Sequence, residues 1–427
     1  MKTIGFLLVG LAITAMLACS NDDNSSETIQ NGESGTGQEA SGDNVFLLTA
    51  EQEAKVASLN DFSFNLFRTV SGDNVSTVVS PLSVAFVLGM IGEGAEGATR
   101  QEITNALGFG TSGNAAREVS EMMKKLIDGA PRVDDSVKVA LANALMVNQL
   151  YRIQNSYQQT LSSYYDASAY SLDFSKPAAL QTINSWCNQK TNGLIPSIID
   201  ELNPETVLCL LNAIYFKGQW TDPFDKNRST GGMFFNGKSY ADQAVMNKQA
   251  VVDYAETADL QALRLPFGNG KYAMTFLLPK QQNGLSALVA SITGNTLQQL
   301  AFSKEEVAMV LPIFKTDAKF LLNPYLKAIG IKRAFEKETE LRNIAEKDGS
   351  PVPLYVSLMI QKTHLGVDEK GSEGAAVTIA EMNSFDGPDD SKEEQSIKKF
   401  IATHPFVYLI SELSSGTVFF VGQFCGQ

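Results

Sequence analysis

Hydrophobic side chains near the start of the folded part recur every three to five residues, which predicts a helix. The recurring positions are Ala54, Leu59, Phe62, Leu66 and Phe67. A β-branched run at 77–79 leads into Ser80-Pro81, which predicts a second helix capped by Ser80 with Pro81 in its first position. Apolar runs of strand length dominate later, at 207–215, 273–278, 306–311, 354–367, 406–410 and 418–421. Helical patterns first and strands later predict an α+β fold.

The first residues carry the pattern of a targeting signal. Lys2 precedes an apolar run at 4–17, which is shorter than the roughly 20 residues of a membrane-spanning helix. Leu17-Ala18-Cys19 resembles the lipobox of bacterial lipoproteins, which implies a signal peptide at 1–18 and acylation of Cys19. A plain secretory signal with an accidental cysteine is the alternative. Residues 19–45 are polar and predict a disordered tether behind the lipidated cysteine.

This beginning predicts a lipid-anchored protein outside the cytoplasm of a bacterium, at the outer membrane. Acidic residues directly after the lipid cysteine resemble the surface-export signals of some Gram-negative lipoproteins. Asp22 and Asp23 stand there, so exposure at the cell surface is also expected.

Composition narrows the function classes. The 427 residues are 44% hydrophobic, and no Pro/Gly/Ser linker divides 46–427, so one large domain is predicted. A net charge of -13 argues against nucleic-acid binding, which needs clustered cations. Cys187, Cys209 and Cys425 lack CxxC spacing, so separate buried thiols are predicted rather than a metal site or a disulfide framework.

The sequence supports neither of two common enzyme signatures. Residues 232–239 match the phosphate-loop pattern GxxxxGK[ST], but no buried strand precedes them and no helix follows, so a strand-turn-strand is predicted. A Ser-His-Asp hydrolase would need a GxSxG elbow, which does not occur. His364 lies in an alternating strand and His404 precedes Pro405 at a strand entry, which is typical of structural histidines. An enzyme is not expected.

The segment after 367 has unusually small side chains. At a strand's period of two, Ser372, Gly374, Ala376 and Thr378 share one face, while Glu373, Ala375 and Val377 share the other. The first face can enter a sheet beneath a layer of helices without steric or desolvation cost, while Glu373 stays in water. A flexible small-residue linker is the alternative.

Five separated blocks resemble, in order, the motifs of the serpin family, over residues 58–424. They are Ser80-Pro81-Leu82-Ser83 with 94–99, 183–196, 211–218 with Trp220, Phe224 and Thr230, 369–376, and His404-Pro405-Phe406. The resemblance implies an α+β serpin fold of three β-sheets with eight or nine helices. The serpin domain is expected at 46–427, with an exposed reactive-centre loop at about 369–399.

The resemblance also implies an irreversible suicide-substrate inhibitor of serine endopeptidases, with cysteine endopeptidases as further targets. The target cleaves the loop and forms an acyl-enzyme, and the loop then inserts into the central sheet. A non-inhibitory serpin, acting as a binding or chaperone module, is the alternative; the small face favours inhibition. We expect a monomer that reaches the membrane only through its lipid anchor, with no cofactor, metal or nucleic acid.

Site residues follow from the same resemblance. The hinge of the loop matches Glu369, Gly371, Ser372, Glu373, Gly374, Ala375, Ala376 and Thr378. The sheet-opening region matches Ser80, Ser83, Asn212, Trp220 and Gln361. Gln361 stands where the family usually has histidine, and it can still hydrogen-bond Asn212 or Ser80.

The reactive bond is counted from the hinge. The family's spacing puts it at Phe385-Asp386, but the loop is longer than in common relatives, so Met382-Asn383 and Asn383-Ser384 remain alternatives. Phe385 suits a chymotrypsin-like or cathepsin-G-like protease. If the register is shifted, the specificity pocket of an elastase-like protease would instead accept one of the residues Val377, Ile379, Ala380 or Met382.

Overall fold

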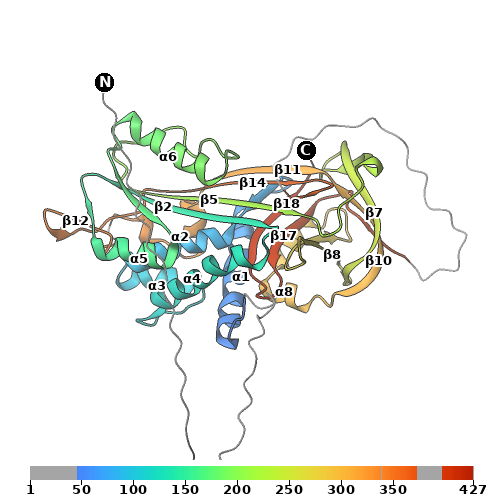
Figure 1. Ribbon diagram of the computed structural model, residues 1–427, viewed down its shortest axis with the longest axis horizontal. Helices are drawn as coiled ribbons and strands as arrows, with labels where there is room; N and C mark the ends of the chain where they lie inside the picture. The colour runs from blue at the N-terminus through green and yellow to red at the C-terminus, as the bar shows by residue number, and fades with distance from the viewer. Residues whose placement is uncertain (1–45, 338, 373–396, 427) are drawn as a thin grey trace, which may run out of the picture. The chain divides into compact units, whose positions relative to one another are not determined.

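Three β-sheets organise the computed structural model, which describes residues 46–337, 339–372 and 397–426. All of these residues belong to one unit, Asn44–Gln427. Figure 1 shows α6 on one face of the central sheet and the layer of α1 to α5 on the other. The prediction of an α+β fold with three sheets and eight or nine helices is thereby confirmed for the described part of the chain, which has nine α-helices.

The central sheet has six strands in the order β11-β14-β15-β5-β2-β4. Their bounds are β11 Phe314–Leu321, β14 Leu358–Val367, β15 Gly371–Ser372, β5 Leu208–Gln219, β2 Lys138–Asn148 and β4 Ser168–Leu172. β5 pairs with β2 over most of its length, whereas β4 pairs with β2 only from Ala144 onward.

A nine-stranded sheet follows the order β1-β18-β17-β9-β8-β7-β10-β16, and β6 pairs with β7 off this path. The bounds are β1 Thr77–Val79, β18 Val418–Phe424, β17 Phe406–Glu412, β9 Tyr272–Pro279, β8 Leu260–Phe267, β7 Tyr240–Glu256, β10 Ser303–Pro312, β16 Lys398–Ile401 and β6 Thr230–Phe235. The third sheet is small: β13 Ser350–Pro351, β12 Ala345–Lys347 and β3 Arg152–Ile153.

Nine α-helices and two 3₁₀ turns cover the sheets in the described residues. The helices are α1 Ala50–Val70, α2 Pro81–Gly94, α3 Gly97–Ala106, α4 Ala115–Val133, α5 Asn155–Tyr165, α6 Pro177–Lys190, α7 Leu285–Ser291, α8 Gly294–Gln299 and α9 Asn323–Ala328. The 3₁₀ turns are η1 Lys226–Arg228 and η2 Arg333–Phe335. None of the helices in these ranges is long and apolar enough to cross a membrane.

Local signals account for the ends of the first two helices. Thr49 and Gln52 form a reciprocal capping box that starts α1 earlier than the hydrophobic spacing indicated. Pro81 opens α2 as predicted, but the predicted cap is only half right. Ser80 holds the N-cap position, yet its hydroxyl donates to the Phe419 carbonyl oxygen at 2.7 Å and makes no capping bond to the helix. The hydroxyl therefore ties α2 to β18.

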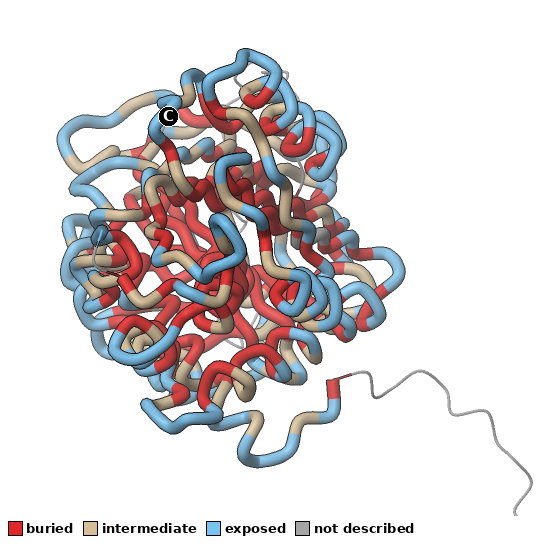
Figure 2. Tube along the Cα trace, turned by 90° about the vertical axis from the view of Figure 1, so that its left-hand side faces the viewer, coloured by how far each residue is buried: buried red, intermediate tan, exposed pale blue. Residues whose placement is uncertain are grey.

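Helix α2 lies at the centre of the core. All of its residues except Glu93 are buried, as a helix that is hydrophobic all round requires. Figure 2 shows this buried interior in red, with exposed residues following the loops and outer turns. The predicted strands are present, although β14 begins at Leu358 instead of 354. Leu354 forms only an isolated bridge with Leu341, and the Val356 amide bonds the Ala334 carbonyl.

The rejected enzyme motifs have structural roles. Residues 232–239 lie in the β6-turn-β7 hairpin, in which Phe235 faces Tyr240, so the strand-turn-strand prediction is confirmed. His364 Nδ1 lies 2.6 Å from Asp317 on the neighbouring strand, and His404 Nε2 lies 2.7 Å from the Pro279 carbonyl oxygen. Cys187, Cys209 and Cys425 are separate buried thiols, as predicted.

Candidate functional site

The central sheet forks between β14 and β5. These two strands run parallel and pair from Leu358 and Cys209 as far as Lys362 and Ala213. Beyond that point β15 lies between them. Ser372 pairs antiparallel with Gly218 of β5 and with Val367 of β14. The chain thus turns back after β14 and places the two residues of β15 in the fork, ahead of the undescribed segment 373–396.

A tight turn and a tryptophan hold this hinge. The Asp368 carboxylate accepts hydrogen bonds from the amides of Lys370 at 2.8 Å and Gly371 at 3.1 Å. Trp220, directly after β5, donates its backbone amide to the Lys370 carbonyl at 2.8 Å and its Nε1 to the Asp368 carbonyl at 2.9 Å. The indole stacks on Phe267, with ring centroids 4.4 Å apart. The turn is therefore fixed to the end of β5.

Glu369 and Ser372 complete the anchorage. The Ser229 hydroxyl donates to the Glu369 carboxylate at 2.6 Å, and the Phe224 amide donates to the Glu369 carbonyl at 2.8 Å. The Ser372 hydroxyl donates to the Gly366 carbonyl at 2.9 Å, and the residue is 1% exposed. Ser372, the first residue of the predicted small face, is thus already buried in the sheet.

Gly371 is required by a close approach of two backbones. A Cβ atom there would lie 2.7 Å from the Cα of Gln219 and closer still to the Gly218 carbonyl oxygen. Backbone atoms of a paired strand cannot move aside as the end of a flexible side chain can. The predicted hinge glycine therefore has a steric reason.

A buried polar network crosses the sheet where it is still closed. Gln361 Nε2 lies 2.9 Å from the Ser80 carbonyl oxygen, 2.9 Å from Ser83 Oγ and 3.0 Å from Asn212 Oδ1, and Gln361 Oε1 accepts from the Ser80 amide at 3.0 Å. The Ser83 hydroxyl also donates to Asn212 Oδ1 at 2.5 Å. Gln361 thus bonds both residues that the sequence suggested. The glutamine side chain thus supplies the hydrogen bonds of this network, and no imidazole is needed there.

The structure places the predicted sheet-opening residues in two groups. Ser80, Ser83, Asn212 and Gln361 meet in the network, but Trp220 belongs to the hinge, eight residues further along the chain of β5 and so roughly 26 Å away. Asn143 of β2 is a member that the sequence analysis missed; its Oδ1 accepts from Asn212 Nδ2 at 2.7 Å. Its only signal was a polar residue inside the apolar run 139–147.

The opposite face of the sheet is covered by α6 and the segment that follows it. Cys187 of α6 and Cys209 of β5 belong to the apolar cluster between them. Burial raises the pKa of Cys187 to about 11 and that of Cys209 to about 12, so both thiols are protonated at neutral pH and unreactive.

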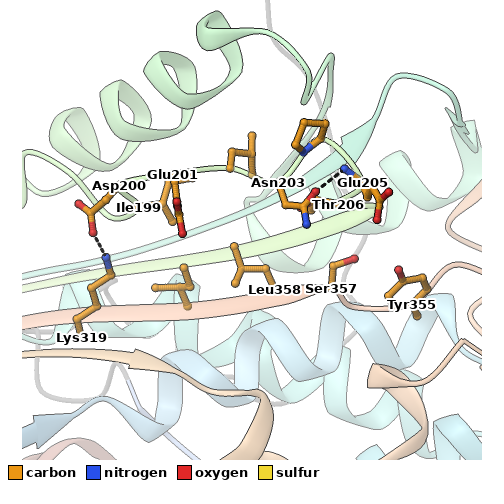
Figure 3. A pocket seen from close by; sticks show the side chains of 13 residues that line it. Ile199, Asp200, Glu201, Asn203, Glu205, Thr206, Lys319, Tyr355, Ser357 and Leu358 are labelled. Carbon is orange, nitrogen blue, oxygen red and sulfur yellow. Dashed lines mark hydrogen bonds and ion pairs between the residues drawn. The ribbon is translucent and has the colours of Figure 1, made fainter.

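A groove of about 990 Å³ lies beside this cluster, between the segment 199–206 and the first half of β14 (Figure 3). Leu358 forms part of its floor, and Lys319 bonds Asp200 across its mouth at 2.8 Å. The groove therefore lies at the closed end of the sheet.

Several predicted site residues lie outside the described part of the chain. They are Cys19, Glu373, Gly374, Ala375, Ala376, Thr378, Met382, Asn383, Ser384, Phe385 and Asp386. The described part of the hinge is Glu369, Gly371 and Ser372, and the structure brings these three residues together beside Trp220. Within the described ranges, no group of three or more His, Cys, Asp or Glu could hold a metal ion.

Comparison with known proteins identifies the family. The family model "Serpin (serine protease inhibitor)" matches residues 57–426. Iripin-2 of Ixodes ricinus is 31% identical over 390 residues, which cover 89% of this chain and 95% of Iripin-2.

Two solved structures extend this likeness to three dimensions. Serpin48 of the insect Tenebrio molitor is 26% identical with a TM-score of 0.76, and the match covers 89% of this chain and 100% of Serpin48. Thyroxine-binding globulin in complex with thyroxine is 25% identical with a TM-score of 0.77, covering 87% of this chain and 99% of the globulin. This chain belongs to the serpin family, whose members are in general protease inhibitors rather than enzymes.

Proposed function

We propose that this serpin is an irreversible suicide-substrate inhibitor of serine endopeptidases, with cysteine endopeptidases as further targets. One observation carries the proposal: β15 already lies antiparallel between β14 and β5, at the open end of a fork that the rest of the loop can enter. Insertion replaces one parallel pairing by two antiparallel ones, and antiparallel pairing is the more stable per residue. Cleavage frees the loop to complete this strand before the acyl bond is hydrolysed.

The register of β15 supports the proposal. Continuing it along both strands would put Gly374 opposite Phe216 and Leu365, and Ala376 opposite Ile214 and Thr363. Directly opposed residues share one face of a sheet, and these four partners are buried. Phe216, Ile214 and Leu365 belong to the core that contains α2. Small side chains are what this face can accept.

The same continued register would put Thr378 on the polar network, opposite both Asn212 and Gln361. A strand between β14 and β5 would double their separation to about 9.6 Å, which breaks the bond from Gln361 Nε2 to Asn212 Oδ1. The Thr378 hydroxyl can donate and accept, so it would replace this bond. A threonine at this position fits an insertion that leaves no buried polar group unpaired.

The first prediction tests insertion. Gly374→Arg and Ala376→Arg each place a charge on the face that must be buried, and every 1.4 kcal/mol or so added to the insertion barrier slows insertion about tenfold. Wild type incubated with chymotrypsin is expected to form an SDS-resistant complex on a gel. Both variants are expected to be cleaved without forming it.

Glu373→Gln is the matched control, because Glu373 belongs to the other face and would lie opposite Lys217; it is expected to keep the wild-type yield. Arginine variants with undiminished yield would contradict the small-face argument. Cleavage of the wild type by every protease tried, with no complex from any of them, would favour the non-inhibitory alternative.

We further propose Phe385-Asp386 as the reactive bond, with Met382-Asn383 and Asn383-Ser384 as the competing registers. Mass spectrometry of the fragment released during complex formation gives its first residue, which is Asp386 under this proposal. Phe385→Ala should then slow a chymotrypsin-like or cathepsin-G-like target. A fragment beginning at Asn383 would instead place Met382 before the cut and favour an elastase-like target, and one beginning at Ser384 would identify Asn383-Ser384 as the bond.

We also propose that acylated Cys19 anchors the chain outside the cytoplasm of a bacterium, at the outer membrane. The lipobox-like Leu17-Ala18-Cys19 and the polar stretch behind it support this. In the second prediction, wild type expressed in a Gram-negative host takes up labelled palmitate and partitions into detergent, whereas Cys19→Ser does neither. Equal labelling of both proteins would contradict the anchor. Protease shaving of whole cells distinguishes surface from periplasmic exposure.

A further inference from the structure

Several Asn-Gly pairs occur along the chain. In such a pair the backbone nitrogen of the glycine can attack the side-chain amide of the asparagine, since glycine has no Cβ atom to hinder the approach. Within the described residues the pairs begin at Asn192, Asn236, Asn269 and Asn283, and one more, at Asn31, lies outside them. The pairs share the same reacting groups, so the fold decides which of them reacts first.

The glycine nitrogens of these pairs differ in their hydrogen bonds. Three of them donate to a backbone carbonyl oxygen at 2.8 Å: Gly193 to Asn188, Gly270 to Phe267 and Gly284 to Gln281. The Gly237 amide, in contrast, donates no hydrogen bond in the part of the chain that the structure describes. A nitrogen must lose its proton before it attacks, and a carbonyl oxygen that accepts this proton opposes the loss. Gly237 therefore has the most available nitrogen of the four.

The turn also prepares the side chain of Asn236. Its Oδ1 accepts hydrogen bonds from the amides of Lys238 at 3.0 Å and Ser239 at 2.9 Å, the two residues directly after Gly237. These bonds curl the side chain toward the backbone that follows it, where the Gly237 nitrogen lies. Negative charge develops on Oδ1 when a nitrogen adds to the amide carbon, and donors already aimed at that oxygen stabilise it.

Solvent reaches this end of the β6-turn-β7 hairpin. Asn236 and Gly237 are half-buried, and Lys238, Ser239 and Tyr240 are exposed. Water and hydroxide can therefore enter, and ammonia can leave.

We propose that Asn236 is a site of spontaneous deamidation. The Gly237 nitrogen gives its proton to hydroxide and bonds to the side-chain amide carbon of Asn236. The bond from this carbon to Nδ2 breaks, Nδ2 leaves as ammonia, and a five-membered succinimide ring remains. Water then opens the ring at either carbonyl carbon, which gives aspartate or isoaspartate. One water molecule is consumed for each ammonia released, and nothing is oxidised or reduced.

The isoaspartate product alters the hairpin as well as its charge. It carries the main chain through the former side chain and so adds a methylene group to the turn that sets Phe235 opposite Tyr240. The Phe235 amide also donates to the Thr403 carbonyl oxygen at 2.8 Å, just after β16. Deamidation thus weakens the contact between this hairpin and the segment that follows β16. Neither the site nor this effect depends on the proposed function.

Peptide mapping by mass spectrometry tests the site. The folded full chain is incubated at mildly alkaline pH, sampled over time and digested in mild acid, where further deamidation is slow. We expect Asn236 to deamidate roughly three- to tenfold faster than Asn192, Asn269 and Asn283, which is the rate effect of one typical hydrogen bond. Both aspartate and isoaspartate are expected at position 236.

The same incubation in denaturant is the matched control, because it removes the tertiary structure and keeps the Asn-Gly pairs. The four rates are expected to converge there. Asn236→Gln would have to close a six-membered ring, so it is expected to lose the modification at 236 and to leave the other three rates unchanged. Gly237→Ala is unsuitable, since its Cβ atom would collide with Asn74 Oδ1.

Three results would contradict the proposal. Equal rates at the four pairs of the folded protein, or a faster rate at one of the other three, would overturn the site. A lead of Asn236 that persists undiminished in denaturant would overturn the role of the turn. Aspartate without isoaspartate would overturn the succinimide step.

The effect on the hairpin has a separate readout. Protein enriched in isoaspartate at 236 is expected to melt a few degrees lower than Asn236→Gln incubated in the same way. Equal melting temperatures would keep the site and overturn the weakening of the hairpin.

Discussion

Under the proposed function, single residues decide whether the fork can open. Gln361 is fully buried and bonds Ser80, Ser83 and Asn212, so it couples the helix layer to both strands that would separate. Removing one side chain from a buried network of this kind costs more than a single exposed hydrogen bond, because it leaves a buried partner unpaired. Gly371 acts differently, because it permits β15 to lie against β5 at all.

The third prediction is that Gln361→Leu destabilises the uncleaved protein. The change leaves the Ser80 amide without its acceptor, and an unpaired buried group costs about 1–3 kcal/mol. Asn212 loses its partner on β14 but keeps the hydrogen bond from the Ser83 hydroxyl. The melting temperature, measured at one fixed scan rate, is therefore expected to fall by several degrees.

The adjacent residue of β14 supplies the control for this variant. Lys362 points to the opposite face of the sheet and is only partly buried, so Lys362→Met leaves the polar network intact. It removes a single hydrogen bond, from Lys362 Nζ to the Ser197 carbonyl oxygen, and is expected to lower the melting temperature less. A melting temperature of Gln361→Leu equal to that of the wild type would show that the network carries no net stability.

At the scale of elements, hydrogen bonds between residues far apart in the sequence hold helices and turns together, and those of Glu340 are an example. The Glu340 carboxylate bonds the amide and hydroxyl of Thr99 at the start of α3, and it receives Arg333 of η2 through two hydrogen bonds of 3.1 and 2.7 Å. The bonds to Thr99 join segments that are 241 residues apart in the chain. The hydrogen bonds from Arg333 and then Thr99 lower the pKa of Glu340 to about 2, from its usual value of 4.5.

The fourth prediction concerns acid stability. Because the pKa of Glu340 is lower in the folded state, its contribution to stability is fully present above about pH 4.5 and is lost as the pH falls toward 2. Glu340→Gln is expected to melt lower than the wild type at pH 7, and the difference should shrink across this window. Melting curves between pH 2 and 7 measure it. A difference independent of pH would assign the effect to packing instead of charge.

Under the proposed function, the whole molecule stores the free energy that a suicide inhibitor needs. Within the described residues β15 is a two-residue strand, whereas its neighbours β14 and β5 have ten and twelve residues and pair directly with each other only as far as Lys362 and Ala213. A longer strand between them would add ladder hydrogen bonds along both neighbours. The uncleaved fold is then held by kinetics as well as by equilibrium stability.

The fifth prediction follows at this scale. Cleavage within 380–394 is expected to raise the melting temperature substantially, because the freed segment can complete the sheet. Calorimetry before and after cleavage measures the change, and gel electrophoresis confirms the cut. Cleaved Ala376→Arg is the control and is expected to gain less. A cleaved wild type that melts no higher than the intact protein would argue for a non-inhibitory member of the family.

Local patterns determined much of this protein before any tertiary structure was needed. Periodicity identified the first helix and the later strands, Pro81 marked the start of α2, and the alternation of small residues singled out the segment that begins at Ser372. These features depend on neighbours in the sequence, because the side-chain period of a helix or strand is a local property. The serpin fold, the hinge and the place of Gln361 came instead from the resemblance of five separated motifs to a known family.

Only the tertiary structure decided which residues meet. Asn143 joins Asn212 across 69 residues, and Gln361 joins Asn212 across 149. The Ser80 hydroxyl, an expected helix cap, bonds β18 because packing brings Phe419 within reach. Trp220 holds the hinge instead of the polar network, since distance along β5 separates the two. Hydrogen bonds of this kind depend on strand order and register, which arise when the sheets and helices pack together.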